Sequence, residues 1–188
     1  MPPDRDLPHH AGDAPAANVE SLRFAPGHHI PNNNLLPALL MRGAAGETGA
    51  KAIIALFARN GWGGAWQYTV FPFHHYHPNA HEVLAVVSGR ADIELGGPEG
   101  SVVSVAAGDV MVLPAGTGHC RVAASDDFSV CGAYPAGQEN YETLRGEAPV
   151  TAAARAQIAA VPLPAADPVF GKAGPLVSLW RDAAAKAR

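Results

Sequence analysis

Short apolar segments, separated by turn-forming residues at close intervals, occupy the middle of this chain. The segments are rich in β-branched residues, and stretches such as Ser88-Gly89, Gly96-Gly97-Pro98 and Pro114-Ala115-Gly116 separate them. This rhythm predicts an all-β core, either an antiparallel barrel or a jelly roll. The predicted strands are Tyr68–Phe73, Val83–Val87, Ala91–Leu95, Val102–Val105, Val110–Leu113 and Phe128–Ala133.

Two elements are predicted ahead of this region. The apolar segment Leu35–Arg42, which Gly43 follows, fits an early strand or an extended arm. From Gly49 to Arg59 the apolar residues fall at helical spacing, and Asn60-Gly61 can take the left-handed conformation that commonly ends a helix. A short helix should therefore precede the main sheet.

The two ends of the chain differ from the middle in composition. The N-terminal segment is rich in Pro, Ala, His and Gly without periodicity, so it cannot bury enough apolar surface to offset its ordering entropy. After Pro135, the segments Thr151–Ala160 and Leu176–Ala187 are helix-prone and prolines separate them. We therefore expect a flexible segment at 1–20, a β-barrel domain with its preceding arm and helix at 21–140, and a helical or irregular tail packed on the barrel at 141–188.

Charge and hydropathy exclude several function classes. The chain of 188 residues is 48% hydrophobic and 16% charged, which suits one domain with a sizeable core. Its formal net charge is −4 and it has no basic run, so nucleic acid is not an expected partner. No apolar run approaches a membrane span, and Met1–Asp6 has no signal-like apolar core. We expect a cytoplasmic protein in which Cys120 and Cys131 are reduced thiols.

A histidine-rich segment carries the chemistry that the sequence suggests. Side chains two positions apart on a strand face the same way, so His75 and His77 can present two imidazoles to one point inside a barrel. A turn at Pro78-Asn79 would then bring Glu82, at the start of the next strand, beside them. Two imidazoles and a carboxylate are typical metal ligands.

A fourth ligand is predicted from a second segment, Gly108–His119. Here a strand ends in the turn Pro114-Ala115-Gly116, and the returning strand opens with His119, which can reach into the same cavity. Three imidazoles and one carboxylate suit one divalent ion of Fe, Mn, Ni, Zn or Cu. They leave one or two positions for water or substrate if the ion is five- or six-coordinate.

These two segments resemble the two conserved motifs of the cupin superfamily. His75, His77, Glu82 and Gly89 match the first motif at its spacing, although the glycine that should precede them is Thr69. Gly108, Pro114, Gly116 and His119 match the second motif, whose final asparagine is Ala123 in this chain. The wider wording, including Ala80-His81-Glu82 and Gly132-Ala133-Tyr134-Pro135, is similar to the YjlB-type cupins from about residue 31 to 138. The resemblance implies a double-stranded β-helix (jelly-roll) barrel and a metal held by His75, His77, Glu82 and His119, and it supplies no substrate.

Several neighbouring residues are weighed separately. Strand alternation points His74 away from His75, and His81 precedes the matching carboxylate by one place, so neither is expected to be a ligand. Phe71 and Phe73 share the parity of His75 and are candidates for lining a substrate cavity, with plain core packing as the alternative. Cys131 is a third candidate for the cavity, through a thiol–tyrosine crosslink, with inert packing favoured.

The expected function follows from the site rather than from the fold. A metal-dependent enzyme acting on a small organic molecule is the leading hypothesis, with dioxygenase-like chemistry preferred and an isomerase or lyase as a second version. The alternative is a non-catalytic cupin that senses or binds a small molecule or a metal. We also expect a homodimer, in which the arm Leu35–Met41 could add a strand across the interface.

Overall fold

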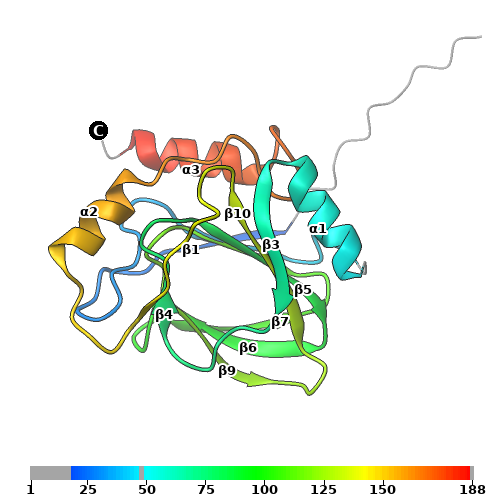
Figure 1. Ribbon diagram of the computed structural model, residues 1–188, viewed down its shortest axis with the longest axis horizontal. Helices are drawn as coiled ribbons and strands as arrows, with labels where there is room; N and C mark the ends of the chain where they lie inside the picture. The colour runs from blue at the N-terminus through cyan, green and yellow to red at the C-terminus, as the bar shows by residue number, and fades with distance from the viewer. Residues whose placement is uncertain (1–17, 47–48, 187–188) are drawn as a thin grey trace, which may run out of the picture.

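The computed structural model describes residues 18–46 and 49–186, and its centre is a barrel of two antiparallel sheets (Figure 1). The six-stranded sheet has the order β1 (Val19–Leu22), β2 (Ala38–Met41), β8 (Val110–Leu113), β5 (Glu82–Ser88), β10 (Ser129–Pro135) and β3 (Trp62–Tyr68). The five-stranded sheet has the order β11 (Leu144–Arg145), β4 (His75–Tyr76), β9 (His119–Ala124), β6 (Arg90–Leu95) and β7 (Ser101–Ala106). The predicted all-β jelly-roll core is confirmed.

Strand β5 shows how the sequence divides its apolar residues between two cores. It lies between β8 and β10, and its first five residues are buried because both of its faces are covered. Leu84 and Val86 point into the barrel interior, where they meet residues of the other sheet such as Ile93. Val83 and Ala85 point outward into a second core against the helices. This double burial explains the continuous apolar run in the sequence.

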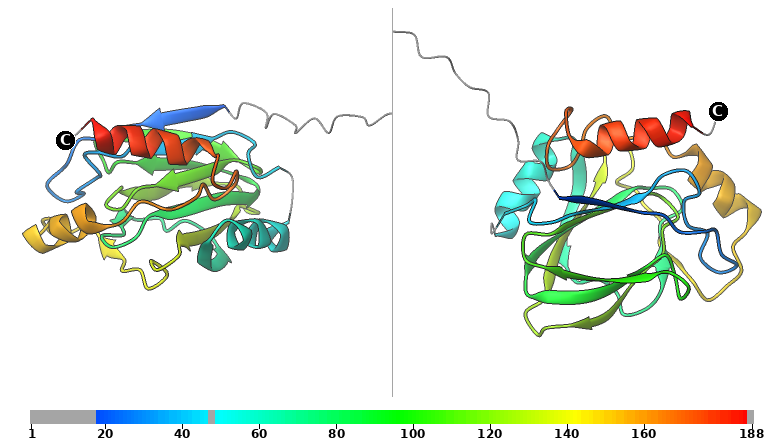
Figure 2. Two further views of the ribbon diagram at one scale, coloured as in Figure 1. Left: turned by 90° about the horizontal axis from the view of Figure 1, so that it is seen from above. Right: turned by 180° about the vertical axis from the view of Figure 1, so that it is seen from behind.

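In the part of the chain that the structure describes, three helices accompany the barrel: α1 (Ala50–Arg59), α2 (Ala152–Ala160) and α3 (Pro175–Ala185). Helices α1 and α3 cover the outside of the six-stranded sheet, as both views of Figure 2 show for α3, and they bury Phe57 and Trp180 there. The helix expected before the sheet and the two expected in the tail are present. Among the described residues, no helix combines the length and the apolar character that a membrane crossing requires.

The strand predicted at Tyr68–Phe73 lies elsewhere, and this part of the prediction is wrong. Strand β3 is Trp62–Tyr68, and the chain is irregular from 69 to 74 before the two-residue β4. Gly63 and Gly64 weaken the apolar pattern of the true strand, whereas Pro72 has no N–H to continue a ladder through the predicted one.

Three other details concern the ends of the chain. Residues 1–17 of the expected flexible segment 1–20 lie outside the described residues. Val19 and Glu20, at the end of that segment, belong to β1. The arm that was expected to reach a second subunit contains β2, which pairs with β1 and β8 of its own chain and has no free edge. The tail contains one strand in addition to its helices, because β11 pairs with β4 beside the histidines.

Gly116 holds the turn of the second motif close to the first. Its φ is +88°, in the region that favours glycine, and a Cβ there would lie 2.7 Å from Cδ1 of Ile158. Its N–H donates to the carbonyl oxygen of His77 at 2.8 Å. This hydrogen bond joins the two motif segments, which are far apart in sequence, directly beside the predicted ligands.

Candidate metal centre

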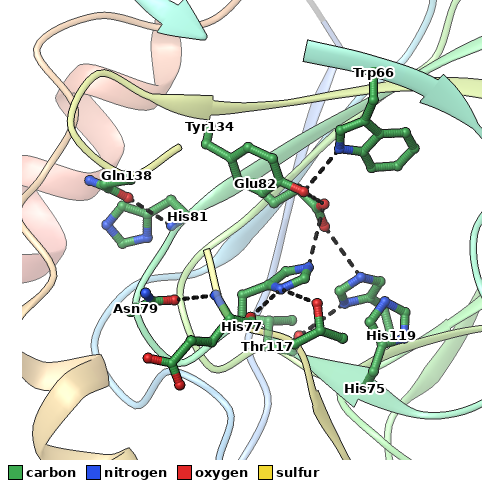
Figure 3. A network of polar contacts seen from close by, with 12 residues as sticks. Trp66, His75, His77, Asn79, His81, Glu82, Thr117, His119, Tyr134 and Gln138 are labelled. Atoms are coloured by element: carbon green, nitrogen blue, oxygen red, sulfur yellow. Dashed lines mark hydrogen bonds and ion pairs between the residues drawn. The ribbon is translucent and has the colours of Figure 1, made fainter. Parts of the chain in front are cut away.

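The four predicted ligands meet at one point inside the barrel, although they come from three strands (Figure 3). His75 on β4 pairs directly with His119 on β9 across the five-stranded sheet. His77 follows β4 by one residue, and Glu82 opens β5 in the opposite sheet. The barrel therefore assembles the group from interior strands of both sheets.

Distances within the group are those of a single small site. One ring nitrogen from each of His75, His77 and His119 lies within 4.8 Å of the others. The carboxylate of Glu82 faces two of these rings, with Oε1 at 3.4 Å from Nε2 of His77 and Oε2 at 3.3 Å from Nε2 of His119. All four residues are buried, with exposed fractions of 2–5%.

Hydrogen bonds to backbone carbonyls determine which ring nitrogen of each imidazole carries a proton and which faces the other ligands. Nδ1 of His75 lies 3.0 Å from the carbonyl oxygen of Phe73, and Nδ1 of His119 lies 3.1 Å from that of Thr117. Nδ1 of His77 lies 2.7 Å from the carbonyl oxygen of Glu142. A carbonyl can only accept a hydrogen bond, so each Nδ1 carries a proton, and the neutral form of each ring has its lone pair on Nε2.

At Glu82 and His77, the neighbouring groups shift the pKa in the direction opposite to that of burial. Burial would raise the pKa of Glu82, but the charges and hydrogen bonds of His77 and His119 hold it well below its usual range. Burial would lower the pKa of His77, but Glu82 raises it above its usual value. Burial and the neighbouring His119 lower the pKa of His75 to about 3. The site thus holds a carboxylate in its charged form among imidazoles.

This donor set fits a divalent cation. Oε2 of Glu82 is buried without a hydrogen-bond partner, although Nε2 of His119 lies 3.3 Å from it. Three nitrogen lone pairs and one carboxylate oxygen converge there, an arrangement that repels itself unless a positive charge lies between its members. Hydrogen bonds from the far ring nitrogens to carbonyl oxygens are the outer contacts that orient metal-binding histidines.

Tyr134 on β10 holds the other oxygen of Glu82. Its hydroxyl donates to Oε1 at 2.9 Å and accepts from Nε1 of Trp66 at 3.0 Å. The indole reaches Tyr134 by lying against Gly132, where a Cβ would be 2.2 Å from the Trp66 ring. This chain of contacts occupies Oε1 of Glu82 with a hydrogen bond, whereas Oε2, which faces His119, has none.

A segment of the tail, residues 139–147, crosses the site and is called the strap here. Its Glu142 carbonyl is the acceptor for His77, and its strand β11 pairs with β4. Asn79 fastens it, because its Oδ1 accepts from the N–H of Glu142 at 2.8 Å and its Nδ2 donates to the carbonyl of Asn140 at 3.1 Å. The strap therefore positions one of the three imidazoles.

A cavity of about 220 Å³ opens beside the four residues. Its walls are mainly aromatic and aliphatic, and they include Phe71, Leu84, Tyr134 and Tyr141 together with the predicted ligands. A small molecule can therefore reach the histidines from one side.

The remaining predicted residues divide between the cavity and its surroundings. Phe71 lines the cavity, whereas Phe73 stacks on Phe71 outside the lining, with its ring centroid 4.9 Å away. The parity argument failed for Phe73 because residues 69–74 are not a strand. Cys131 lies among the outer core residues, with its Sγ 3.8 Å from the carbonyl oxygen of Ala50. Burial raises its pKa to about 11, and it is removed from the cavity.

His74 and His81 lie outside the group, as the sequence indicated. Nε2 of His74 lies 3.0 Å from Oε2 of Glu94 on β6. His81 is fully buried, and burial lowers its pKa to about 3. Its neutral ring accepts at Nδ1 from the N–H of Ala115 at 2.9 Å and packs on Trp180. Gln138 accepts from the backbone N–H of His81, which ties the tail to the same turn.

Sequence reasoning missed Tyr134, Trp66 and the strap. Cys131 faces the outer core and Tyr134 has the opposite parity on β10, but the sequence alone does not indicate which face of this strand is the inner one. No sequence signal marks the Glu142 carbonyl, since any residue supplies one.

Comparison with known proteins places these observations in a family context. A family model described as "Cupin domain" matches residues 67–131. The "Uncharacterized protein YjlB" of Bacillus subtilis (strain 168) is 40% identical over 158 residues, which cover 84% of this chain and 93% of that protein.

Similar solved structures are more distant. Acireductone dioxygenase from Bacillus anthracis, a structure with a cadmium ion in its active centre, is 20% identical with a TM-score of 0.36, and the match covers 54% of this chain and 64% of that one. Procruciferin, an 11S globulin from Brassica napus, is 16% identical with a TM-score of 0.36, over 58% of this chain and 22% of that one. Matches at this level carry no conclusion about chemistry.

Proposed function

Since the chain belongs to the YjlB-type cupins, we propose that it is a metal-binding cupin in which His75, His77, Glu82 and His119 hold one divalent ion beside a small-molecule cavity. The observation that carries the proposal is the commitment of all three Nδ1 protons to backbone carbonyls. It leaves three Nε2 lone pairs and the unpartnered Oε2 of Glu82 directed at one point.

We further propose that the protein is an enzyme with dioxygenase-like activity on a small organic molecule. When bound, a redox-active ion supplies the O₂ chemistry of such an enzyme, and a redox-inert ion supplies Lewis-acid polarisation of a carbonyl. An isomerase or lyase also needs a separate base. Among the described residues of the cavity wall, the ionisable groups beyond the four proposed ligands are Tyr68, Tyr134 and Tyr141. Burial and the charge of Glu82 raise the pKa of Tyr134 far above its usual value, which disfavours it as a base.

The lack of a suitable base on the described cavity wall favours a second candidate, a non-catalytic cupin that binds a metal or a small molecule. A binding module requires the ligand set and the cavity but no acid or base. The metal identity separates the two, because oxygenase chemistry requires an ion that changes its redox state.

The first experiment is elemental analysis of the protein purified without added metal. We expect about one equivalent of a divalent ion in the wild type and loss of most of it in His77→Ala. His74→Ala is the matched control, since this neighbouring imidazole contacts Glu94 instead of the site, and it should retain the metal. A metal-free wild type, or equal loss in both variants, would contradict the proposed centre.

The second experiment measures oxygen uptake by the same preparation with a panel of carboxylates, catechols and thiols. Uptake that requires both substrate and metal, and that disappears in His77→Ala, supports the dioxygenase. A redox-inert metal with no uptake contradicts it and leaves the isomerase or lyase and the binding module.

A further inference from the structure

Exposed aromatic rings gather at the cavity beside the proposed metal centre. Seven large apolar side chains are exposed in the described part of the chain, and the three aromatic ones, Tyr68, Phe71 and Tyr141, all line this cavity. Phe71 is 39% exposed and Tyr141 is 38% exposed. Aromatic surface left open in a concave site is surface that a bound molecule can cover favourably.

Two of these rings stand directly beside the imidazoles. The Tyr141 ring stacks on Tyr134, with centroids 4.0 Å apart, and meets His77 edge-on at 5.1 Å. The Phe71 ring meets His75 edge-on, also at 5.1 Å. A ligand that reaches the histidines therefore has an aromatic ring available on the His75 side and another on the His77 side.

The charge of the wall restricts the ligand further. No Lys or Arg is found among the described residues that line the cavity, and Glu82 is their only acidic residue. Two arginines lie near Phe71 and Phe73 but outside the lining: Arg145 is over the Phe73 ring at 3.8 Å, and Nε of Arg121 donates to the carbonyl oxygen of Val70. A second acidic group on a ligand would thus lose its hydration without gaining a cationic partner.

Size gives the last restriction. An engineered apolar cavity of about 150 Å³ accommodates benzene. The present cavity of about 220 Å³ has room for one ring and a short substituent. A nucleotide or an oligosaccharide would extend beyond the cavity.

We infer that the ligand of this site is a small ring-bearing molecule with a single anionic or chelating oxygen group. That group would face the four proposed metal ligands, and the ring would pack against Tyr141 and Phe71. The inference rests on the proposed metal centre, and it makes Tyr141 and Phe71 specificity-determining residues.

A matched series of hydroxamates tests the inference by calorimetric binding to the metal-loaded protein. Acetohydroxamate, benzohydroxamate and 4-carboxybenzohydroxamate share one chelating group and differ in the body attached to it. We expect benzohydroxamate to bind at least about tenfold more tightly than acetohydroxamate, because its ring buries more apolar surface. The added carboxylate should cost at least about tenfold.

Each outcome separates this inference from the proposed metal centre. Binding of acetohydroxamate as tight as that of benzohydroxamate, or tighter binding of the carboxylated probe, overturns the ligand class and leaves the metal centre intact. Failure of all three probes to bind a protein with a full metal content overturns the open metal centre itself.

Variants of the cavity wall test which residues cause the preference for benzohydroxamate over acetohydroxamate. Tyr141→Ala and Phe71→Ala should each reduce the preference for benzohydroxamate while changing acetohydroxamate affinity less than about twofold. Tyr141→Phe should restore the preference, because it retains the ring. Val122→Ala, which trims an exposed apolar side chain outside the cavity, is the control and should change nothing. Equal losses for both probes in Tyr141→Ala, without rescue by Tyr141→Phe, would contradict the specificity role.

Discussion

At the scale of single residues, the site depends on how hydrogen bonds divide the atoms of each ligand. Every imidazole has one nitrogen committed to a carbonyl and one directed at its neighbours. Glu82 is divided in the same way, with Oε1 held by Tyr134 and Oε2 left without a hydrogen bond. The far atom of each side chain is anchored, so the near atom keeps its direction without a ligand being present.

Tyr134→Phe tests the anchoring of Glu82. The variant keeps the ring but removes the donor to Oε1 and leaves Nε1 of Trp66 without its acceptor. We expect metal affinity to fall about 10- to 100-fold, measured by competition with a chromogenic chelator. Tyr68→Phe, at a ring that is 63% exposed, is the matched control. Unchanged affinity in Tyr134→Phe would show that Glu82 needs no support.

His81→Ala tests whether this histidine is purely structural. The change leaves the N–H of Ala115 without its acceptor and removes the ring that packs on Trp180. We expect unfolding free energy to fall by about 2–4 kcal/mol in urea denaturation. His74→Ala loses a partly exposed ion pair and should cost less than about 1 kcal/mol. Metal content should stay at the wild-type level in folded His81→Ala, and its loss would assign this residue to the metal centre.

At the scale of elements, the strap joins the tail to the first motif segment. It supplies the carbonyl that orients His77, it adds β11 beside β4, and the N–H of Gly146 donates to the carbonyl oxygen of His74 at 2.9 Å. Most of these contacts are backbone contacts, so their formation depends on where the chain passes rather than on which residues it carries. The tail is therefore part of the site.

Asn79→Ala tests the attachment of the strap. The variant removes the acceptor for the N–H of Glu142 and the donor to the carbonyl of Asn140. Native-state hydrogen exchange of a peptide covering 139–147 should become faster by about tenfold, while exchange in α3 stays unchanged as the internal control. Equal exchange of the strap in wild type and variant would mean that β11 alone holds it.

At the scale of the whole molecule, the barrel keeps edges that can pair with a second copy. Among the described strands, β7 pairs only with β6, and β3 pairs only with β10. Val102 on β7 is 55% exposed. Because exposed strand edges invite pairing between identical chains, the expectation of a homodimer stands on these edges rather than on the arm.

Light scattering coupled to size-exclusion chromatography measures the number of chains directly. We expect a mass of two chains of 19.4 kDa each. A single-chain mass at micromolar concentration would contradict the predicted dimer.

The sequence by itself determined the fold class and the proposed ligand set. Turn residues at short intervals favour an antiparallel barrel, and two motif segments contain all four side chains that converge, because local spacing and strand alternation are periodic properties that can be counted along the chain. Predictions from strand alternation failed where the regular strand ended, because the irregular stretch before β4 places Phe73 outside the cavity. The face on which Cys131 lies became clear only from its pairing partners on β5 and β3.

Only the tertiary structure decided what surrounds that set. Tyr134 reaches Glu82 across neighbouring strands, Trp66 reaches Tyr134 because Gly132 leaves room for its ring, and the Glu142 carbonyl reaches His77 across 65 residues of chain. These contacts have no sequence period, and one of them is made by a backbone atom common to all residues. The identities of the four convergent side chains are thus readable from the sequence, whereas their protonation, their orientation and the aromatic wall beside them depend on how the chain is folded.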